Sequence, residues 1–429
     1  MKNKNIDNKF YVYRFRIYPN AEQVAYLDEQ MSYNRFVYNF FLERATHLYK
    51  THNIKFNYYE FKKILPLLKK GFSFLKEANA QSLQASLKDL DDAFQNFFQH
   101  RAKFPNFKKK GVYNSIVIPQ NFEIKDSFIN IPKLKTAIKV KFHRKVYEAV
   151  KSISISKTTS GKYYVNMLVE KFAFTPYIPK KTIGVSTGID LGLKDFAIIT
   201  TGTDFDNKES FKIPNPKYLV KSQKRLIKLS RQLDRKVHKR SKQDKTTPSK
   251  NYIKFKNKLS KLHEHIFNQR KDFLHKLSLR TVSDSQVVVL EDLNIKGMVK
   301  NGNLSKPISD VSWSRFVSML EYKASWYGRQ VFKVNRFYPS SKACSTQDCG
   351  YVYKDLKLSE RFWTCPQCGV VHDRDINASI NLFLEGLTVL KNTPGTAELT
   401  PAEYAPAGYQ NIGISRHTLR QEAYAFRRR

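Results

Sequence analysis

Hydrophobic positions near the start of the chain change from a two-residue period to a helical period. Residues 10–18 alternate apolar with more polar side chains, which is typical of a β-strand. Pro19 ends that strand, and Asn20 and Gln23 then match a capping box at the start of a helix. Apolar residues recur at helical spacing as far as Tyr49, and their ordinary interpretation is a helix packed in a bundle.

A second helical pattern runs from about Ala78 to Ala102, with leucines and phenylalanines in its apolar stripe. Gln81, Gln84 and Lys88 share another face, from which they could contact base edges or phosphates. A solvated polar face is the more common explanation of such a pattern. Both interpretations stay open for these three residues.

The loop at 100–111 then interleaves basic residues with Phe104 and Phe107. Cations beside aromatic rings suit phosphate contact and base stacking on single-stranded or structured nucleic acid. A basic loop held in place by two core phenylalanines is an equally good interpretation. The lysines of this loop are Lys103, Lys108, Lys109 and Lys110.

Short β patterns separated by turn-forming pairs fill the next part of the chain. They lie at 115–118, 128–131, 138–142, 152–156 and 163–169. Together with the first strand they predict a small barrel. The helical region is then an insertion into the first connection of that barrel.

A second set of strands and helices contains candidate catalytic carboxylates. Residues 183–202 predict a hairpin whose first strand carries Asp190. Residues 287–290 are wholly apolar, which fits a buried strand, and they end in Glu291. A carboxylate at the end of a buried strand is costly unless a cation or hydrogen bonds compensate it. A helix at 313–326 and a strand at 331–337 follow.

Two basic helical patterns lie between these strands, joined by a polar segment at 241–251. They predict an antiparallel pair of helices. Their outer faces carry charge of nearly one sign, so we place phosphate contact ahead of solvation as its explanation. Lys228, Arg231 and Arg235 are the candidates on the first helix.

Composition adds a partner to this picture. The 429 residues include 76 Lys+Arg against 37 Asp+Glu, a formal net charge of +39. A folded body with this charge repels itself unless a polyanion neutralises it, so nucleic acid is the leading partner. The length suits about three domains. We see no apolar run of about 18 residues and no signal-like N-terminus, so we expect no membrane partner and a cytoplasmic location.

All four cysteines fall in one stretch as two pairs, which predicts a metal site in a reducing compartment. Four thiolates form a closed tetrahedral zinc site, so we expect one structural Zn²⁺ without an open position for water. The first pair is separated by four residues, where two are more common. The predicted ligands are Cys344, Cys349, Cys365 and Cys368.

An acidic run follows the cysteines directly. Asp375 falls near the start of a helical pattern, where a capping role is the default interpretation. However, Asp190, Glu291 and Asp375 all lie at element boundaries of one predicted α/β domain. Three convergent carboxylates can hold two Mg²⁺ ions for phosphodiester hydrolysis.

Five segments resemble the signature segments of TnpB, the nuclease encoded by bacterial insertion sequences and related to compact type V CRISPR nucleases. They are GIDLGLKDFAI, VLEDLNIKGM, FYPSSKACS, CPQCG and HDRDINASINLF, and the similarity covers about residues 10–385. The resemblance implies a multidomain α+β fold: a wedge β-barrel with an inserted helical recognition region, then an RNase H-like (RuvC) α/β domain split by a zinc ribbon.

The resemblance also assigns bounds and roles. It makes Asp190, Glu291 and Asp375 the catalytic Mg²⁺ ligands, supported by Asp292 and Asp373, and the four cysteines the zinc ligands. It gives Gln81, Gln84 and Lys88 a possible part in reading a flanking motif. The implied segments are the wedge at 1–19 and 104–180, the helical insertion at 20–103, the nuclease domain at 181–338 and 371–390 with a basic hairpin at 219–280, and the zinc ribbon at 339–370. The tail at 391–429 is rich in Pro, Ala, Gly and Thr without a sustained period, so its composition predicts a segment that is disordered or bound to RNA.

The implied function is RNA-guided cleavage of DNA next to a short flanking motif. The expected partners are a guide RNA and target double-stranded DNA, with one protein copy per RNA, although a dimer is also possible, in a prokaryotic cytoplasm at the nucleoid. A compact type V CRISPR nuclease, a nuclease-inactive RNA-guided repressor, and a zinc-dependent DNA-binding protein or strand-joining transposase are the alternatives. Intact carboxylates favour the nuclease.

Overall fold

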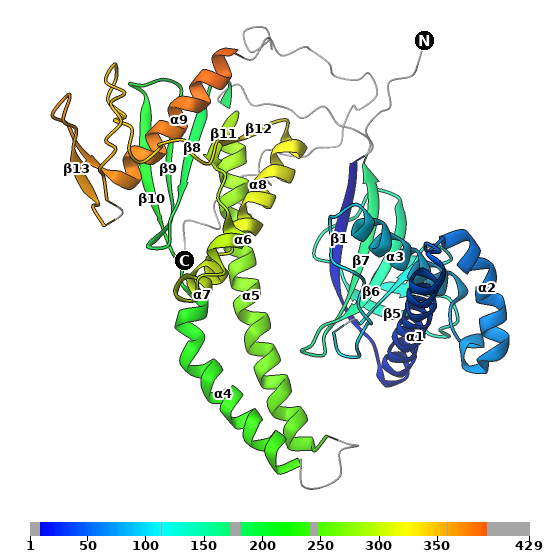
Figure 1. Ribbon diagram of the computed structural model, residues 1–429. Helices are drawn as coiled ribbons and strands as arrows, with labels where there is room; N and C mark the ends of the chain where they lie inside the picture. The colour runs from blue at the N-terminus through cyan, green and yellow to red at the C-terminus, as the bar shows by residue number, and fades with distance from the viewer. Residues whose placement is uncertain (1–8, 113, 172–181, 241–247, 358, 393–429) are drawn as a thin grey trace, which may run out of the picture. The chain divides into compact units, whose positions relative to one another are not determined.

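The computed structural model describes residues 9–112, 114–171, 182–240, 248–357 and 359–392 (Figure 1). These residues form two compact units. The first comprises Met1–Pro176 with Lys217–Phe273, and the second comprises Tyr177–Pro216 with Leu274–Arg429, each within the described ranges. No helix among the described residues is long and apolar enough to cross a membrane.

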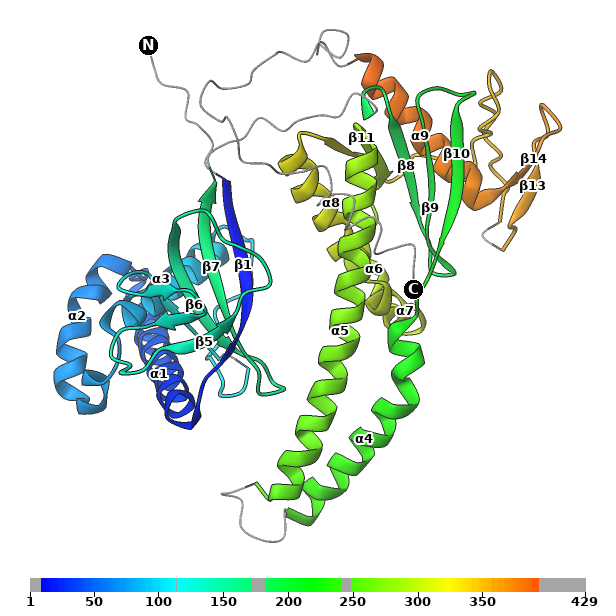
Figure 2. The same cartoon turned by 180° about the vertical axis from the view of Figure 1, so that it is seen from behind.

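The first unit contains a curled seven-stranded sheet, visible from both sides in Figures 1 and 2. β1 (Lys9–Tyr18) lies in its middle, where Phe15 and Ile17 point into the core, as the two-residue period predicts. The strands pair in the order β2-β6-β7-β1-β5-β4-β3. The others are β2 (Ser115–Ile118), β3 (Glu123–Lys125), β4 (Phe128–Asn130), β5 (Ile138–Lys141), β6 (Val150–Lys157) and β7 (Tyr163–Lys171).

Helices occupy the connection from β1 to β2, where the sequence predicts an insertion. The Asn20 and Gln23 side chains form the predicted capping box at the start of α1. Sequence analysis missed α2, which contains a proline and is shorter than its neighbours. The helices are α1 (Ala21–His52), α2 (Tyr58–Gly71), a 3₁₀ turn (Ser73–Lys76) and α3 (Ala80–Phe98).

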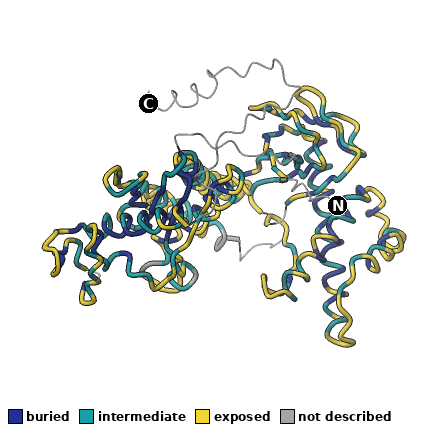
Figure 3. The backbone as a smooth tube through the Cα atoms, turned by 90° about the horizontal axis from the view of Figure 1, so that it is seen from above, coloured by how far each residue is buried: buried dark blue, intermediate teal, exposed yellow. Residues whose placement is uncertain are grey.

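The basic hairpin is formed by α4 (Tyr218–Arg240) and α5 (Lys250–Asp284), which run side by side in Figures 1 and 2. Part of the predicted polar connection, 241–247, lies outside the described residues, as does 393–429 of the predicted tail. In Figure 3 the buried positions gather inside each unit, whereas exposed positions lie along loops and along the outer sides of helices.

The second unit is built on a five-stranded sheet in the order β10-β9-β8-β11-β12. β8, β9 and β10 form an antiparallel meander. β11 then pairs in parallel with β8, and β12 pairs in parallel with β11. β11, whose first four residues are apolar, lies between two parallel neighbours, as its sequence predicts. The strands are β8 (Ser186–Leu191), β9 (Asp195–Gly202), β10 (Lys208–Pro214), β11 (Val287–Glu291) and β12 (Gln330–Val334).

The remaining elements complete this unit. The short α6 (Ile295–Met298) and α7 (Gly302–Val311) precede α8 (Trp313–Tyr327), which leads into β12. The cysteine segment follows and contains a small hairpin of β13 (Phe362–Thr364) and β14 (Val371–Asp373). The chain then enters α9 (Arg374–Asn392), which lies against the sheet (Figure 1).

Candidate carboxylate and cysteine sites

Asp190 and Glu291 reach the same face of the sheet because of their positions in neighbouring strands. Gly188 of β8 pairs with Val289 of β11 in parallel register. A Cβ atom on Gly188 would lie 2.3 Å from the backbone nitrogen of Phe383, so this face of β8 is directly covered by α9. Side chains two positions apart share a face. Asp190 and Glu291 therefore lie two residues further along their strands than this contact, on the face of the sheet that α9 covers.

Asp375 is brought to the same place by the start of α9. The Asp373 carboxylate caps the helix, because its Oδ1 accepts the backbone N–H groups of Asp375 at 3.0 Å and Ile376 at 3.3 Å. Lys212 of β10 donates to Asp373 Oδ2 at 2.7 Å. Burial alone would raise the pKa of Asp373, but these donors outweigh it and lower the pKa. The helix start is thus fixed to the sheet.

The electrostatics of Asp190 show that the three carboxylates interact. The pKa of Asp190 rises from 3.8 to about 8, chiefly because the side chain is buried and also because the charges of Glu291 and Asp375 act in the same direction. Arg374 partly opposes this shift. We call Asp190, Glu291 and Asp375 the carboxylate cluster. Such a cluster of like charges favours a bound cation.

Two arginines balance part of the negative charge of the carboxylate cluster. Arg361, from the cysteine segment, donates to Asp375 Oδ2 at 2.9 Å and lies 3.6 Å from Asp195 Oδ2. Arg374 contacts Asp375 Oδ1 at 3.2 Å. Asp195, at the start of β9, thus adds a fourth carboxylate beside the cluster. Carboxylate oxygens are the ligands that Mg²⁺ prefers, so the donor set fits this ion.

A set of hydrogen bonds made by Asn377, Asn381 and Ser340, which we call the clamp, connects the carboxylate cluster to the first cysteine. The Ser340 hydroxyl donates to the Glu291 carboxylate. Asn381 Nδ2 of α9 donates to the carbonyl oxygens of Ser340 and Ala343, both at 2.7 Å. Asn377 donates to Ala343 O at 2.6 Å and accepts from the backbone N–H of the residue after Cys344 at 3.0 Å. Both asparagines are buried, so these bonds fix the 340–345 segment on α9.

The four cysteine sulfurs lie close together, and we call them the cysteine cluster. Their ligand atoms all lie within 4.8 Å of one another. Cys344 and Cys368 are 3.6 Å apart, and Cys349 and Cys365 are 3.7 Å apart. A tetrahedron with Zn–S bonds of about 2.3 Å has edges of about 3.8 Å. The cluster therefore fits a zinc ion. The four residues between Cys344 and Cys349 do not move the Cys349 sulfur out of the cluster.

Comparison with known proteins agrees with this arrangement. Family models match residues 164–302 ("Probable transposase"), 11–54 ("Helix-turn-helix domain") and 313–382 ("Cas12f1-like, TNB domain"). A "Putative RNA-guided DNA endonuclease" of Streptomyces pristinaespiralis is 35% identical over 381 residues, which cover 87% of this chain and 89% of the relative. The chain belongs to the TnpB-like family of RNA-guided DNA endonucleases.

A second TnpB-like relative has similar coverage. "Putative RNA-guided DNA endonuclease InsQ" of Escherichia coli K12 is 31% identical over 397 residues, covering 88% of this chain and 92% of the relative. Among solved structures, the mini-RNA-guided endonuclease CRISPR-Cas_phi3 matches with a TM-score of 0.51 at 11% identity, covering 89% of this chain and 93% of that one. That likeness concerns the fold. Over 11–54, where one model is named for a helix–turn–helix, this TnpB-like chain has one strand and one continuous helix.

Among the predicted nucleic-acid residues of this TnpB-like chain, two of the three on α3 have internal partners. Gln81 Nε2 donates to Gln120 at 3.3 Å. Lys88 Nζ lies 2.7 Å from Asp91 and 3.2 Å from Asp92. Gln84 is half-buried. Nucleic-acid contact by these three residues stays a prediction.

The basic loop after α3 combines both interpretations weighed from the sequence. The Phe104 ring packs against Phe94 and Phe97 of α3, with centroids at 5.7 and 5.2 Å, whereas Phe107 is 52% exposed. Lys108 pairs with Asp89 at 3.1 Å, so its charge is balanced. Their role in binding also stays a prediction. The other predicted cations are exposed: Lys103, Lys109, Lys110, Lys228, Arg231 and Arg235.

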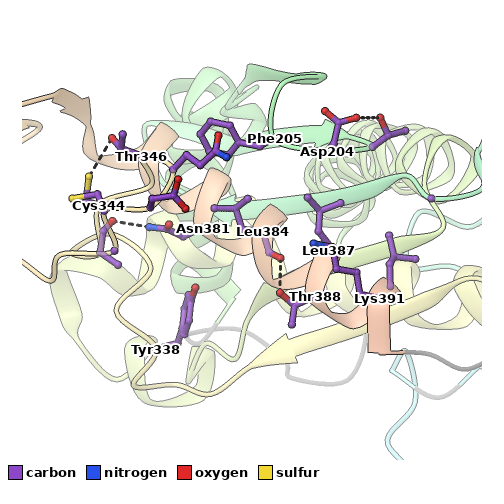
Figure 4. Close-up of a pocket in the computed structure, with 18 of the residues that line it drawn as sticks. Asp204, Phe205, Tyr338, Cys344, Thr346, Asn381, Leu384, Leu387, Thr388 and Lys391 are labelled. Carbon is purple, nitrogen blue, oxygen red and sulfur yellow. Dashed lines mark hydrogen bonds between the residues drawn. The ribbon is translucent and has the colours of Figure 1, made fainter. Parts of the chain in front are cut away.

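A large groove lies on the other side of the clamp, between α9, the β9–β10 turn and the first cysteine pair (Figure 4). Its volume is about 950 Å³, and Leu384, Leu387 and Thr388 of α9 line it. The dashed bond in Figure 4 from Asn381 shows that the clamp forms one wall. None of the three clustered carboxylates lines this groove. It is therefore separate from the carboxylate cluster.

Several residues that shape the site were missed by sequence reasoning. Arg361 and Asp195 carried no signal beyond an ordinary charge next to an element boundary. Ser340 could be identified only once its contact with Glu291 was known. The two asparagines did carry a signal: their spacing of four places them on one face of a helix whose other residues are largely apolar.

Proposed function

We propose that the protein is an RNA-guided DNA endonuclease and that its carboxylate cluster is the catalytic site. The supporting observation is the raised pKa of Asp190, which arises from burial beside Glu291 and Asp375. Such a buried, mutually repelling set is costly unless it serves to hold cations. Relatives that share most of this chain's length are named as endonucleases guided by RNA, which supports guide RNA and target DNA as partners.

Asp190, Glu291 and Asp375 would hold two Mg²⁺ ions. Bound Mg²⁺ would activate a water molecule and stabilise the leaving oxygen of a phosphodiester. Ser340 orients Glu291, and Asp373 fixes the start of the helix that carries Asp375. The protein's own contribution is thus to hold the carboxylates on one rigid edge of the sheet.

The domain assignment belongs to the same proposal. The sheet order β10-β9-β8-β11-β12, with a meander followed by two parallel strands, supports an RNase H-like (RuvC) domain at 181–338 and 371–390. The cysteine cluster supports a zinc ribbon at 339–370 that interrupts this domain. The curled sheet supports the wedge at 1–19 and 104–180, with helical recognition elements inserted at 20–103.

The decisive experiment uses the full chain purified with the RNA that accompanies it. The RNA is sequenced, and cleavage of DNA that matches its guide segment is measured with and without Mg²⁺. We expect cleavage only in the reactions that contain Mg²⁺. Asp190→Ala and Asp375→Ala should each lower cleavage by at least about a thousandfold while RNA-guided DNA binding is retained, because only the metal ligands are lost.

Asp206→Ala is the matched control, because Asp206 is an exposed aspartate of the same unit outside the cluster. It should cleave at the normal rate. Full cleavage by either cluster variant would overturn the assignment of the catalytic site. Absence of any discrete copurified RNA would overturn the guided mechanism.

A further inference from the structure

Two aromatic side chains of the second unit stand in solvent close to the carboxylate cluster. Phe337, in the turn after β12, is 88% exposed, and Phe362, the first residue of β13, is 66% exposed. Single exposed apolar side chains are ordinary on protein surfaces and need no explanation. These two differ from the ordinary case because each follows a residue whose side chain contacts an acidic group at or beside the cluster.

The turn that carries Phe337 is held at both ends. Arg336 Nη2 lies 3.3 Å from Oδ2 of Asp292, the residue directly after Glu291. The Ser340 hydroxyl, at the other end of the turn, donates to the Glu291 carboxylate. A side-chain oxygen within the same turn accepts the backbone N–H of Phe337 at 2.9 Å. The Phe337 ring therefore extends from a rigid support at the Glu291 side of the cluster.

The ribbon hairpin places Phe362 at the Asp375 side of the cluster. Arg361, the residue before it, donates to Asp375 Oδ2 at 2.9 Å. Phe362 itself is the cross-strand partner of Asp373, whose carboxylate caps the helix that carries Asp375. Cross-strand partners project from the same face of a hairpin, with Cβ atoms about 5 Å apart. The Phe362 side chain therefore begins next to a residue that fixes Asp375 in place.

Each ring has a cation nearby. Arg336 precedes Phe337 and is partly exposed. Lys212, which is also partly exposed, is bonded to the cross-strand partner of Phe362 at 2.7 Å. Val371 lies diagonally across the hairpin from Phe362 on the same face and is 65% exposed, so it widens the apolar surface beside that ring. Aromatic faces for bases, with cations for phosphates, are the combination that proteins use to hold single strands.

We propose that Phe337 and Phe362 hold a single DNA strand across the carboxylate cluster by stacking on the bases that flank the phosphodiester to be cleaved. The inference rests on the proposed nuclease function and names the form of substrate that its site takes. Bases of a duplex already stack on their neighbours, so only an unpaired strand can offer base faces to two separate rings. Every base has an aromatic face, so these contacts accept any sequence.

The first test detects the stacking contacts without cleavage. The full chain with its copurified RNA is mixed with a short DNA oligomer that contains 5-iododeoxyuridine, without divalent cations so that the DNA stays intact. On irradiation, 5-iodouracil forms adducts with aromatic side chains that stack on it, and mass spectrometry of the peptides locates them. We expect adducts on Phe337 and Phe362. Adducts on neither ring would overturn the proposal.

The second test measures single-turnover cleavage of guide-matched DNA. Phe337→Ala and Phe362→Ala should each slow cleavage by at least about fivefold, as expected when one stacked base is lost. Phe337→Trp and Phe362→Trp should cleave at nearly the normal rate, because indole is also a flat aromatic ring. Tyr327→Ala is the matched control and should cleave normally, since Tyr327 is an exposed aromatic residue at the end of α8, before the opposite end of β12.

Abasic nucleotides separate stacking from a structural role. Once the cleaved bond has been mapped, the bases beside it are removed from the DNA. The unmodified protein should then cleave about as slowly as the alanine variants, and the variants should lose no further rate. Alanine variants that cleaved intact and abasic DNA more slowly by the same factor would overturn the proposal. If the adducts form but no DNA is cleaved, the stacking site stands and only the nuclease assignment is overturned.

Discussion

The cysteine cluster and the carboxylate cluster are neighbours in the second unit, but they differ in how ready they are for a metal. The cysteine sulfurs already stand at tetrahedral distances, with ligand atoms within 4.8 Å of one another. In the described part of the chain, no other group of three or more His, Cys, Asp or Glu side chains meets that spacing. In the carboxylate cluster, Asp375 instead pairs with Arg361 and Arg374, and Glu291 accepts from Ser340.

This difference follows from the chemistry of the two ligand types. Neutral thiols can pack together in a core, and Cys344 and Cys365 are almost fully buried. Ionised carboxylates repel one another, so each takes a cation or a hydrogen-bond donor until a metal replaces it. A set of thiols can therefore be built into the fold, whereas a set of carboxylates keeps exchangeable partners. The clamp of Asn377 and Asn381 joins the two.

Among the tests of this comparison, removing a cysteine should have the largest effect. Cys365→Ser should lower the zinc content from one ion per chain to about none, because the structural site loses one of four ligands and metal binding contributes directly to folding. Cleavage should fall by at least about a hundredfold, since the ribbon carries Arg361 and adjoins the clamp. Metal analysis and cleavage rates measure both effects.

Thr364→Ser, in the adjacent strand, is the matched control and should keep its zinc. If Cys365→Ser bound zinc normally, the cysteine cluster would not be the zinc site. If it lost zinc but cleaved at the normal rate, the two sites would be independent.

An intermediate effect should follow from breaking the clamp. Asn381→Ala removes two hydrogen bonds to the Ser340 and Ala343 carbonyl groups, each worth about 0.5–1.5 kcal/mol. Both carbonyl groups still accept from Asn377, at 3.4 and 2.6 Å. Zinc should be retained, while the cleavage rate falls about tenfold because Ser340 orients Glu291 less well. Asn392→Ala at the exposed end of α9 should change neither quantity. Normal cleavage by Asn381→Ala would show that the clamp only stabilises the fold.

The smallest effect concerns the charge of the carboxylate cluster without metal. The folded protein keeps a proton on Asp190 that the unfolded chain releases, because burial and the charges of Glu291 and Asp375 raise the pKa from 3.8 to about 8. The free energy of unfolding should therefore fall as the pH rises between these values. Asp190→Asn removes this dependence on pH. Without divalent cations, the variant should melt at a higher temperature than the unmodified protein, and the difference should widen from pH 5 to pH 8.

Mg²⁺ should reduce that margin, because it stabilises the ionised form that only the unmodified protein can provide. A margin that stayed constant with pH would show that Asp190 is already ionised in the metal-free protein. The carboxylate cluster would then be as ready for metal as the cysteine cluster.

Much of the fold could be predicted where pattern and local chemistry agree. The alternation of β1, the capping box of α1, the apolar run of β11 and the paired cysteines each depend on neighbouring residues alone. The α2 helix was missed because its stripe is short and contains Pro66. The short β3 was missed because three residues show no clear period.

The sequence by itself determined the ligand types and the order of the elements, because hydrophobic period, caps and cysteine spacing act over a few residues. Tertiary structure decided which charges meet. Asp195, Arg361 and Asp375 come from three distant segments, and only the pairing of strands and the packing of α9 bring them together. The same is true of Ser340 and Glu291. Long-range contacts of this kind depend on register and helix packing, which no local pattern specifies.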